Sequence, residues 1–266
     1  ICFGTTYIAD DVSSIEACES DSVKPTYRVT LSDDSQLEAS SLIIATGSSF
    51  RKLGVPGEQE LSGHGVSYCA TCDGFFFRNK PIVVVGGGDS AFEEALFLTR
   101  FGSSVTLIHR RDSFRASQIM VDRAKANPTI TLMTNTVVTS ITGTSSPTQN
   151  TGAPIAIPGL TLKRPAVAPA SVSSIAVRNV VTGEESTLDT NAVFVAIGHT
   201  PATDFAAGVV DRDDDGYVVV QGASTVTSAP GIFAAGDCVD RTYRQAISAA
   251  GMGCRAALDT QAYLTD

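Results

Sequence analysis

The segment from Tyr68 to Gly74, YCATCDG, places two cysteines two residues apart beside an aspartate. Thiols at this spacing have three uses: half of a zinc site, a buried structural pair, or a disulfide that opens and closes. A closed zinc site needs four ligands, and the three histidines of the chain are scattered, without a second CxxC or a CxxH. Because a two-residue gap permits a small, reducible ring, we favour a redox-active pair, Cys69 and Cys72, with the other two uses left open.

Asp73 follows the second cysteine directly. A carboxyl group at this place can serve as the acid or base that handles the proton of a thiol. The alternative is a polar turn residue that precedes Gly74.

A glycine motif follows the CxxC segment along the chain. The stretch GGGDSA matches G-x-G-x-x-A, with Gly86 and Gly88 as its glycines and Asp89, Ser90 and Ala91 after them. It follows the apolar run PIVVV and precedes a helix expected over about 89–101. In that strand–turn–helix context, glycines let a pyrophosphate approach the backbone at a helix N-terminus. We therefore expect a dinucleotide site, the alternative being an ordinary glycine turn.

The second strand of this unit ends in HRRDSFR, from His109 to Arg115. An NAD site would place an acidic residue near here, about 20 residues after the glycines, for the ribose hydroxyls. Arg110, Arg111 and Arg115 instead offer cations to a 2′-phosphate. The segment favours NADPH over NADH, the alternative being a solvated charged loop.

The composition narrows the class of protein. The chain has 266 residues, 43% of them hydrophobic and 18% charged, and this length gives about two domains as a prior. No apolar run approaches the roughly 18 residues of a membrane helix. The formal charge of −9 disfavours nucleic acid as a partner. Four isolated cysteines fit a reducing, cytoplasmic location; they are Cys2, Cys18, Cys238 and Cys254.

The remaining pattern is that of an α/β protein. Residues 1–47 are β-rich, and a glycine-rich connector follows a domain junction expected near residue 50. The glycine motif lies in a βαβ unit, which implies parallel strands. A second helix is expected over 115–127 and a C-terminal one over about 244–264.

Two other segments carry no site in this interpretation. Residues 144–174 are rich in Pro, Ser, Thr and Ala, and we expect a flexible insertion there. DRDDDG, residues 211–216, begins like a calcium loop, but the twelfth position is Gly222 where a glutamate is required. We expect an acidic turn.

Five segments together resemble one known family. They are CATCDGFFFR, VVVGGGDSAFEEALFLTRFG, HRRDSFRAS, FVAIGHTP and GIFAAGDCVDRTYRQAISAAGMGCRAALD. On these segments the chain resembles the low-molecular-weight, flavin-dependent thioredoxin reductases, over nearly its whole length apart from the insertion. The resemblance implies two Rossmann-like, three-layer β/β/α domains of the pyridine nucleotide-disulfide oxidoreductase type. It also implies FAD, NADPH and a homodimer. From the residues themselves we expect no metal site.

The resemblance assigns roles to individual residues. It makes Cys69 and Cys72 the redox pair and Asp73 the proton donor. The residues that it assigns to NADPH are Gly86, Gly88, Asp89, Ser90, Ala91, His109, Arg110, Arg111 and Arg115. Those that it assigns to FAD are Thr46, Gly47, Gly236, Asp237, Arg244, Gln245 and Ala246.

The resemblance also implies a domain order. A discontinuous FAD-binding domain would comprise residues 1–49 and 198–266, and an NADPH-binding domain residues 50–197. The family's first βαβ unit, with its own G-x-G-x-x-G, has no counterpart after Ile1, so we expect the chain to be truncated at its N-terminus. Because both electron partners of the flavin lie on one inserted domain, we expect that domain to rotate about hinges near residues 50 and 198.

The expected reaction passes electrons from NADPH through FAD and the cysteine pair to thioredoxin. Thioredoxin's disulfide lies near −270 mV, so it needs a donor about as reducing, and a flavin converts hydride into thiol chemistry. The expected location is the cytoplasm, with an organelle possible if the missing start carried a transit peptide. Two alternatives stay open: a related flavoprotein that serves a peroxidase, and a non-catalytic NADPH-binding fragment.

Overall fold

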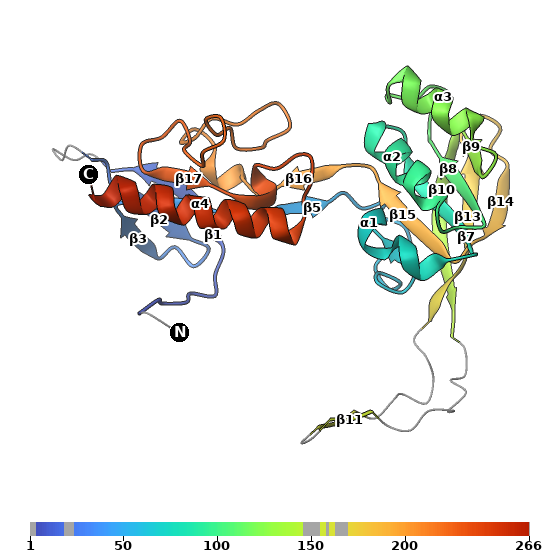
Figure 1. The fold of residues 1–266 in the computed structure, drawn as a ribbon, viewed down its shortest axis with the longest axis horizontal. Helices are drawn as coiled ribbons and strands as arrows, with labels where there is room; N and C mark the ends of the chain where they lie inside the picture. The colour runs from blue at the N-terminus through green and yellow to red at the C-terminus, as the bar shows by residue number, and fades with distance from the viewer. Residues whose placement is uncertain (1–3, 19–23, 146–154, 158–159, 163–169, 266) are drawn as a thin grey trace. The chain divides into compact units, whose positions relative to one another are not determined.

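The computed structural model describes residues 4–18, 24–145, 155–157, 160–162 and 170–265. The chain divides into two compact units, one of residues 1–49 with 199–266 and the other of residues 50–198 (Figure 1). None of the helices in the described ranges has the length and apolar character that crossing a membrane requires.

The unit of residues 50–198 is built on a five-stranded parallel sheet in the order β6-β15-β7-β8-β9. Its strands are β6 (Val66–Ser67), β7 (Pro81–Gly86), β8 (Ser104–Ile108), β9 (Ile130–Met133) and β15 (Ala192–Ala196). The predicted βαβ unit is confirmed, because β7 and β8 pair in parallel and a helix connects them along the chain. That helix, α2 (Asp89–Leu98), begins where the sequence predicted.

Both faces of this sheet are covered, which explains why two of its inner strands, β7 and β15, are continuously apolar. Ile82 and Val84 of β7 face one core cluster, and Val83 and Val85 face another. Helices cover the first face: α1 (Ala70–Asp73), α2, and α3 (Gln118–Ala126), with the 3₁₀ turn η1 (Gly74–Phe77). An antiparallel sheet covers the second: β10 (Thr136–Thr144), β13 (Ser171–Asn179) and β14 (Glu185–Asp189). The predicted β/β/α layering is confirmed.

Two predicted boundaries in this unit were wrong. Helix α3 begins at Gln118 and not at Arg115, because the backbone N–H groups of Arg115 and Ala116 donate to Gly87 O instead of starting a helix. Helix α2 ends at Leu98, three residues before the predicted end at Phe101, whose N–H closes a turn onto Leu98 O.

The expected insertion over 144–174 is partly ordered. β10 runs to Thr144 and β13 starts at Ser171, in register across Gly143 and Val172. Two further strands, β11 (Ile155–Ile157) and β12 (Leu160–Leu162), pair antiparallel. The β-branched residues at both ends of the segment continue the sheet in spite of its Pro-rich composition. The rest of the predicted loop lies outside the described residues.

The other unit contains an antiparallel sheet, a short parallel sheet and the C-terminal helix. The first sheet is β1 (Val12–Ala17), β2 (Tyr27–Leu31) and β3 (Gln36–Ala39), and the second is β4 (Leu42–Ile44) with β17 (Ile232–Ala234). The 3₁₀ turns are η2 (Asp204–Ala206) and η3 (Gly236–Cys238), and the helix is α4 (Ala246–Thr265). The described part of residues 1–47 contains strands and no helix, as predicted.

The two crossings of the chain between the units lie side by side. β5 (Ser48–Phe50) pairs with β16 (His199–Pro201), and the N–H of Arg51 donates to Gly198 O at 3.0 Å. Gly198 has φ +104°, a conformation that side-chain-bearing residues rarely adopt.

Candidate active site

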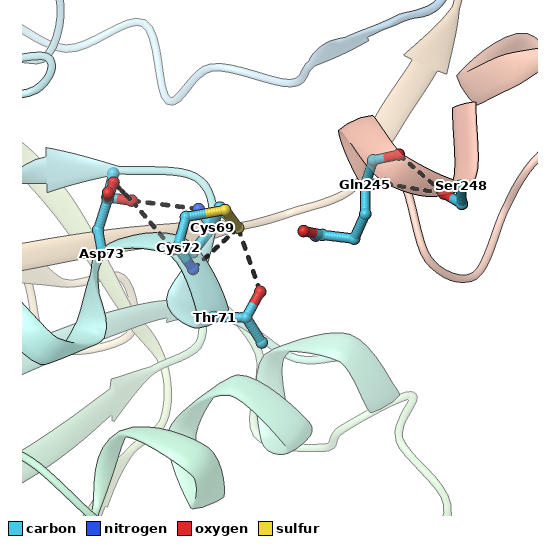
Figure 2. Close-up of a disulfide and its surroundings, with 7 residues drawn as sticks. Cys69, Thr71, Cys72, Asp73, Gln245 and Ser248 are labelled. Carbon is cyan, nitrogen blue, oxygen red and sulfur yellow. Dashed lines mark hydrogen bonds between the residues drawn. A yellow bond between two sulfur atoms is a disulfide. The ribbon is translucent and has the colours of Figure 1, made fainter. Parts of the chain in front are cut away.

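The two cysteines of the CxxC segment are joined in a disulfide (Figure 2). Cys69 caps the four-residue helix α1: its Sγ accepts from the N–H of Cys72 at 3.3 Å and lies 3.3 Å from Thr71 Oγ1. Cys72 is exposed and Cys69 is half-buried. The two sulfurs are therefore bonded to each other, and the described residues contain no cluster of three metal-ligating side chains.

Asp73 is held beside this disulfide by a serine that the sequence did not single out. Ser67, buried at the end of β6, donates from Oγ to Asp73 Oδ2 at 2.7 Å. The same hydroxyl accepts from the N–H of Cys69 at 3.1 Å. The carboxylate thus has a fixed orientation, which a proton donor to one of the two sulfurs requires.

The glycine turn lies between β7 and α2, as its motif predicted. A Cβ on Gly86 would lie 2.4 Å from Ala196 O, and one on Gly87 would lie 2.2 Å from His109 Nδ1. A Cβ on Gly88 would meet nothing within 4 Å, and Gly88 is the N-cap of α2. The first two glycines are needed for packing, whereas Gly88 leaves open space at a helix N-terminus, where backbone N–H groups bind phosphate.

Ala91 is fully buried, whereas Asp89 and Ser90 are exposed in the first turn of α2. The Asp89 carboxylate accepts from the N–H and the Oγ of Ser117, each at 2.8 Å. These two hydrogen bonds lower the pKa of Asp89 and tie the start of α2 to the start of α3.

The predicted arginine segment folds back onto the glycine turn. Arg110, Arg111 and Arg115 are all exposed, and the N–H of Arg115 reaches Gly87 O at 2.8 Å. Three guanidinium groups therefore belong to a loop that is bonded to the turn, which suits recognition of a phosphate attached to the ribose.

His109 differs from the three arginines, because its ring is buried, with 9% of the residue exposed. Its Nε2 lies 3.1 Å from Ser113 O, and its ring packs 5.2 Å from that of Phe114. Burial lowers the pKa of His109. Hydrogen bonds to the backbone of Ser113 and Gly86 act in the opposite direction, whereas the charges of Arg110 and Arg111 lower the pKa further. The structure places His109 behind Gly87 and not among the exposed cations.

The residues predicted to contact FAD gather in the other unit, around a cavity of about 390 Å³. Its lining residues are Ala45, Gly47, Ala235, Gly236, Asp237, Gln245, Ala246, Ala249 and Gly253. Gly47 and Gly236 have φ values of +71° and +80°, so each turns the chain sharply at the end of β4 or β17. Desolvation, with Asp240 nearby, raises the pKa of Asp237. Glycine backbone and one partly desolvated carboxyl suit a ligand rich in hydroxyls.

Thr46 and Arg244 adjoin this cavity in sequence and are not among its lining residues. Thr46 Oγ1 donates to Ala202 O at 2.5 Å. Arg244 has φ +45°, and its N–H donates to Asp240 Oδ2 at 3.0 Å.

Asp240 is a second residue that sequence reasoning missed. Its carboxylate accepts from the N–H groups of Thr242, Tyr243 and Arg244, and these bonds lower its pKa although desolvation acts in the opposite direction. The start of α4 is fixed further by Ser248 Oγ, which donates to Gln245 O at 2.8 Å (Figure 2). The signal that could have identified it is an aspartate at the start of a turn, where its carboxylate can accept from backbone N–H groups two to four residues further along the chain.

A reducible disulfide and a dinucleotide-type glycine turn in one β/β/α unit define a pyridine nucleotide-dependent disulfide oxidoreductase. Comparisons with known proteins agree with this class. The family model "Pyridine nucleotide-disulphide oxidoreductase" matches residues 5–253. A thioredoxin reductase of Mycolicibacterium smegmatis is 52% identical over 242 residues, which are 91% of this chain and 70% of that protein.

A bifunctional thioredoxin reductase/thioredoxin of Mycobacterium leprae (strain TN) is 48% identical, over 99% of this chain and 51% of that protein. The crystal structure of thioredoxin reductase from Streptococcus pyogenes MGAS5005 matches with a TM-score of 0.80 at 37% identity, over 96% of this chain and 74% of that one. The chain belongs to the thioredoxin reductase family, whose members contain FAD and use NADPH.

Proposed function

We propose that this chain takes electrons from NADPH, through FAD, to the Cys69–Cys72 disulfide and from there to thioredoxin. The observation that carries the proposal is the disulfide itself, half exposed and with Asp73 oriented beside it in the unit that holds the glycine turn. Membership of the thioredoxin reductase family supports the direction of electron flow.

In this proposal the NADPH pyrophosphate lies against Gly88 and the N-terminus of α2, where Gly88 leaves open space. The guanidinium groups of Arg110, Arg111 and Arg115 bind the 2′-phosphate. His109 supports the turn from behind, and Asp89 keeps α2 and α3 together through Ser117.

The cavity in the other unit would hold part of FAD, since its volume is within the range of ligand pockets and glycine backbone lines it. Asp237 would hold its ribityl hydroxyls, and the segment from Arg244 to Ala246 would face the flavin ring at the start of α4. A bound flavin supplies the conversion between two-electron hydride chemistry and thiol chemistry.

At the disulfide, two electrons break the S–S bond and leave one thiolate on each sulfur. Asp73, once protonated from solvent, would give its proton to one thiolate and return to the carboxylate form, and the hydrogen bond from Ser67 fixes the orientation of its carboxyl group. The reduced pair passes its electrons to a thioredoxin disulfide by exchange, through a mixed disulfide.

We infer three further properties that the family supports: action on thioredoxin as the protein substrate, a homodimer, and a cytoplasmic location. We also infer a rotation of the unit of residues 50–198 about the paired strands β5 and β16. Gly198, with its positive φ beside this pair, suits a hinge.

The test is a thiol count on the protein supplied with FAD and NADPH. The wild-type protein should gain one pair of thiols, and Cys69→Ser and Cys72→Ser should gain none. No gain in the wild type would overturn the proposal and favour a non-catalytic NADPH-binding fragment. Turnover with a peroxidase module and not with thioredoxin would favour the related flavoprotein.

A further inference from the structure

Glu58 is a buried carboxylate that the proposed electron path does not use, with 2% of the residue exposed. Its Oε1 accepts from the N–H of Leu53 at 2.9 Å and from Tyr68 OH at 3.1 Å, and its Oε2 accepts from the N–H of Gly54 at 2.8 Å. Burying a charge is costly unless hydrogen bonds compensate for it. Here the compensating hydrogen bonds join two segments, because two donors belong to the connector after β5 and the third is Tyr68, the residue before Cys69.

Tyr68 joins the same two segments a second time. Its ring stacks on that of Phe50, with centroids 4.9 Å apart and planes at 23°. Desolvation, together with Glu58, raises the pKa of Tyr68 to about 12, so the hydroxyl stays protonated and donates to Glu58 at any working pH. In the next residue, the N–H of Cys69 is fixed by Ser67.

Phe50 is the last residue of β5, at the point where the chain crosses into this unit. The stack and the Glu58 carboxylate therefore connect the crossing point to Tyr68, the residue that directly precedes Cys69. Gly54, with φ +73°, gives the connector the turn that brings its N–H to Glu58.

We propose that Glu58, Tyr68 and Phe50 form a brace that ties the disulfide to the hinge, with Tyr68 as a positioning residue for Cys69. Residues 50–54 and 67–73 then move as one piece. A rotation that begins at residue 50 therefore moves the sulfurs as part of the same rigid body, because the connector does not deform. The relevance of the brace to catalysis rests on the proposed function, whereas its effect on the disulfide does not.

Two rates test the brace: reduction of the disulfide by dithiothreitol, and its reduction by NADPH in the FAD-loaded protein. Tyr68→Phe keeps the ring and removes the bond to Glu58, Glu58→Gln removes the charge, and Phe50→Ala removes the stack. We expect each variant to speed reduction by dithiothreitol at least threefold, because a loosened segment admits the small dithiol. We expect the same variants to slow the NADPH-driven rate, because the sulfurs are less well positioned.

Glu60→Gln and Tyr7→Phe are matched controls, since both residues are exposed, and neither should change either rate. If Glu58→Gln or Phe50→Ala lowers the melting temperature, the dithiothreitol rate of Tyr68→Phe decides the test, because this variant preserves the ring. Dithiothreitol rates within twofold of wild type in Tyr68→Phe and Glu58→Gln would overturn the positioning role. An unchanged rate in Phe50→Ala alone would overturn the link to the hinge. Failure of the proposed function would appear separately, as a wild-type disulfide that NADPH does not reduce.

Discussion

Ser67 Oγ donates to Asp73 Oδ2 at 2.7 Å and accepts from the N–H of Cys69 at 3.1 Å. One hydroxyl therefore fixes both the backbone of a redox cysteine and the carboxyl group proposed to protonate the pair. Nothing in the spacing of these residues indicates this, because Ser67 belongs to β6 and Asp73 ends α1.

The first prediction concerns Asp73 as proton donor. Asp73→Asn should lower the rate of thioredoxin reduction about 100-fold, because general acid catalysis contributes about 10²- to 10⁴-fold. Ser67→Ala, which keeps the acid and removes its orientation, should have a smaller effect of about tenfold on the same rate. Asp214→Asn, at an exposed site outside the proposed binding residues, is the control. Steady-state turnover measures all three, and wild-type activity in Asp73→Asn would contradict the assignment.

The second prediction concerns coenzyme choice. Arg111→Ala should weaken NADPH binding about 10- to 100-fold, since a hydrogen bond to a charged group contributes about 1.5–3 kcal/mol. NADH, which lacks the 2′-phosphate, should bind within about twofold of wild type, because the variant removes only the phosphate contact. Fluorescence titration of both coenzymes gives the ratio. Arg178→Ala on β13 is the control, and an equal loss for both coenzymes in Arg111→Ala would refute the role.

The third prediction compares two neighbouring glycines. Gly87→Ala places a Cβ 2.2 Å from the His109 ring and should destabilise the protein by about 1–3 kcal/mol, the range for overpacking. Gly88→Ala meets no atom within 4 Å, so its stability should match wild type while its affinity for NADPH falls. Thermal melts and coenzyme titration separate the two effects. Equal stability of both variants would show that the packing of the turn is different.

The fourth prediction concerns the pH dependence of stability. The pKa of His109 is lowered from 6.5 by burial, so below that value the unfolded chain binds a proton that the folded protein takes up less readily. The contribution of neutral His109 to the free energy of unfolding is thus complete above about pH 6.5, and it is lost as the pH falls toward the lowered pKa. Melting temperatures from pH 8 to pH 5 should fall less steeply in His109→Gln than in wild type. His64→Gln, an exposed histidine, should follow wild type.

The fifth prediction concerns the turn before α4. Asp240→Ala removes the carboxylate to which the three backbone N–H groups of this turn donate, one of them from Arg244. Arg244 has φ +45°, a conformation that costs about 1–2 kcal/mol for a residue with a side chain. FAD should then dissociate about tenfold more readily, as followed by flavin fluorescence, since about 1.4 kcal/mol corresponds to a factor of ten. Asp214→Ala, in an exposed turn, is the control. Unchanged flavin retention would remove Asp240 from the site.

Much of the fold follows from the sequence. The apolar run before Gly86 predicts a buried parallel strand, and the glycines after it predict the turn and helix α2. The segment SIAVRNVVTGEESTL, with its turn at Thr182–Gly183, predicts a hairpin, and β13 and β14 form it. These predictions hold because each element is specified by residues next to one another in the chain.

The insertion over 144–174 shows where local pattern misleads. Its Pro and Ser content indicates a loop, yet the described ends pair across β10 and β13. Strand pairing depends on a partner about 30 residues away, which composition does not encode.

By itself, the sequence determined which residues are available for the proposed chemistry: a CxxC pair, a glycine turn of the dinucleotide type and a set of arginines proposed to bind phosphate, because each depends on residue type and short spacing. The tertiary structure alone decided which groups support them. His109 lies behind the turn, Ser67 orients Asp73, and Glu58 meets Tyr68, since burial and hydrogen bonding between segments arise only when the segments pack.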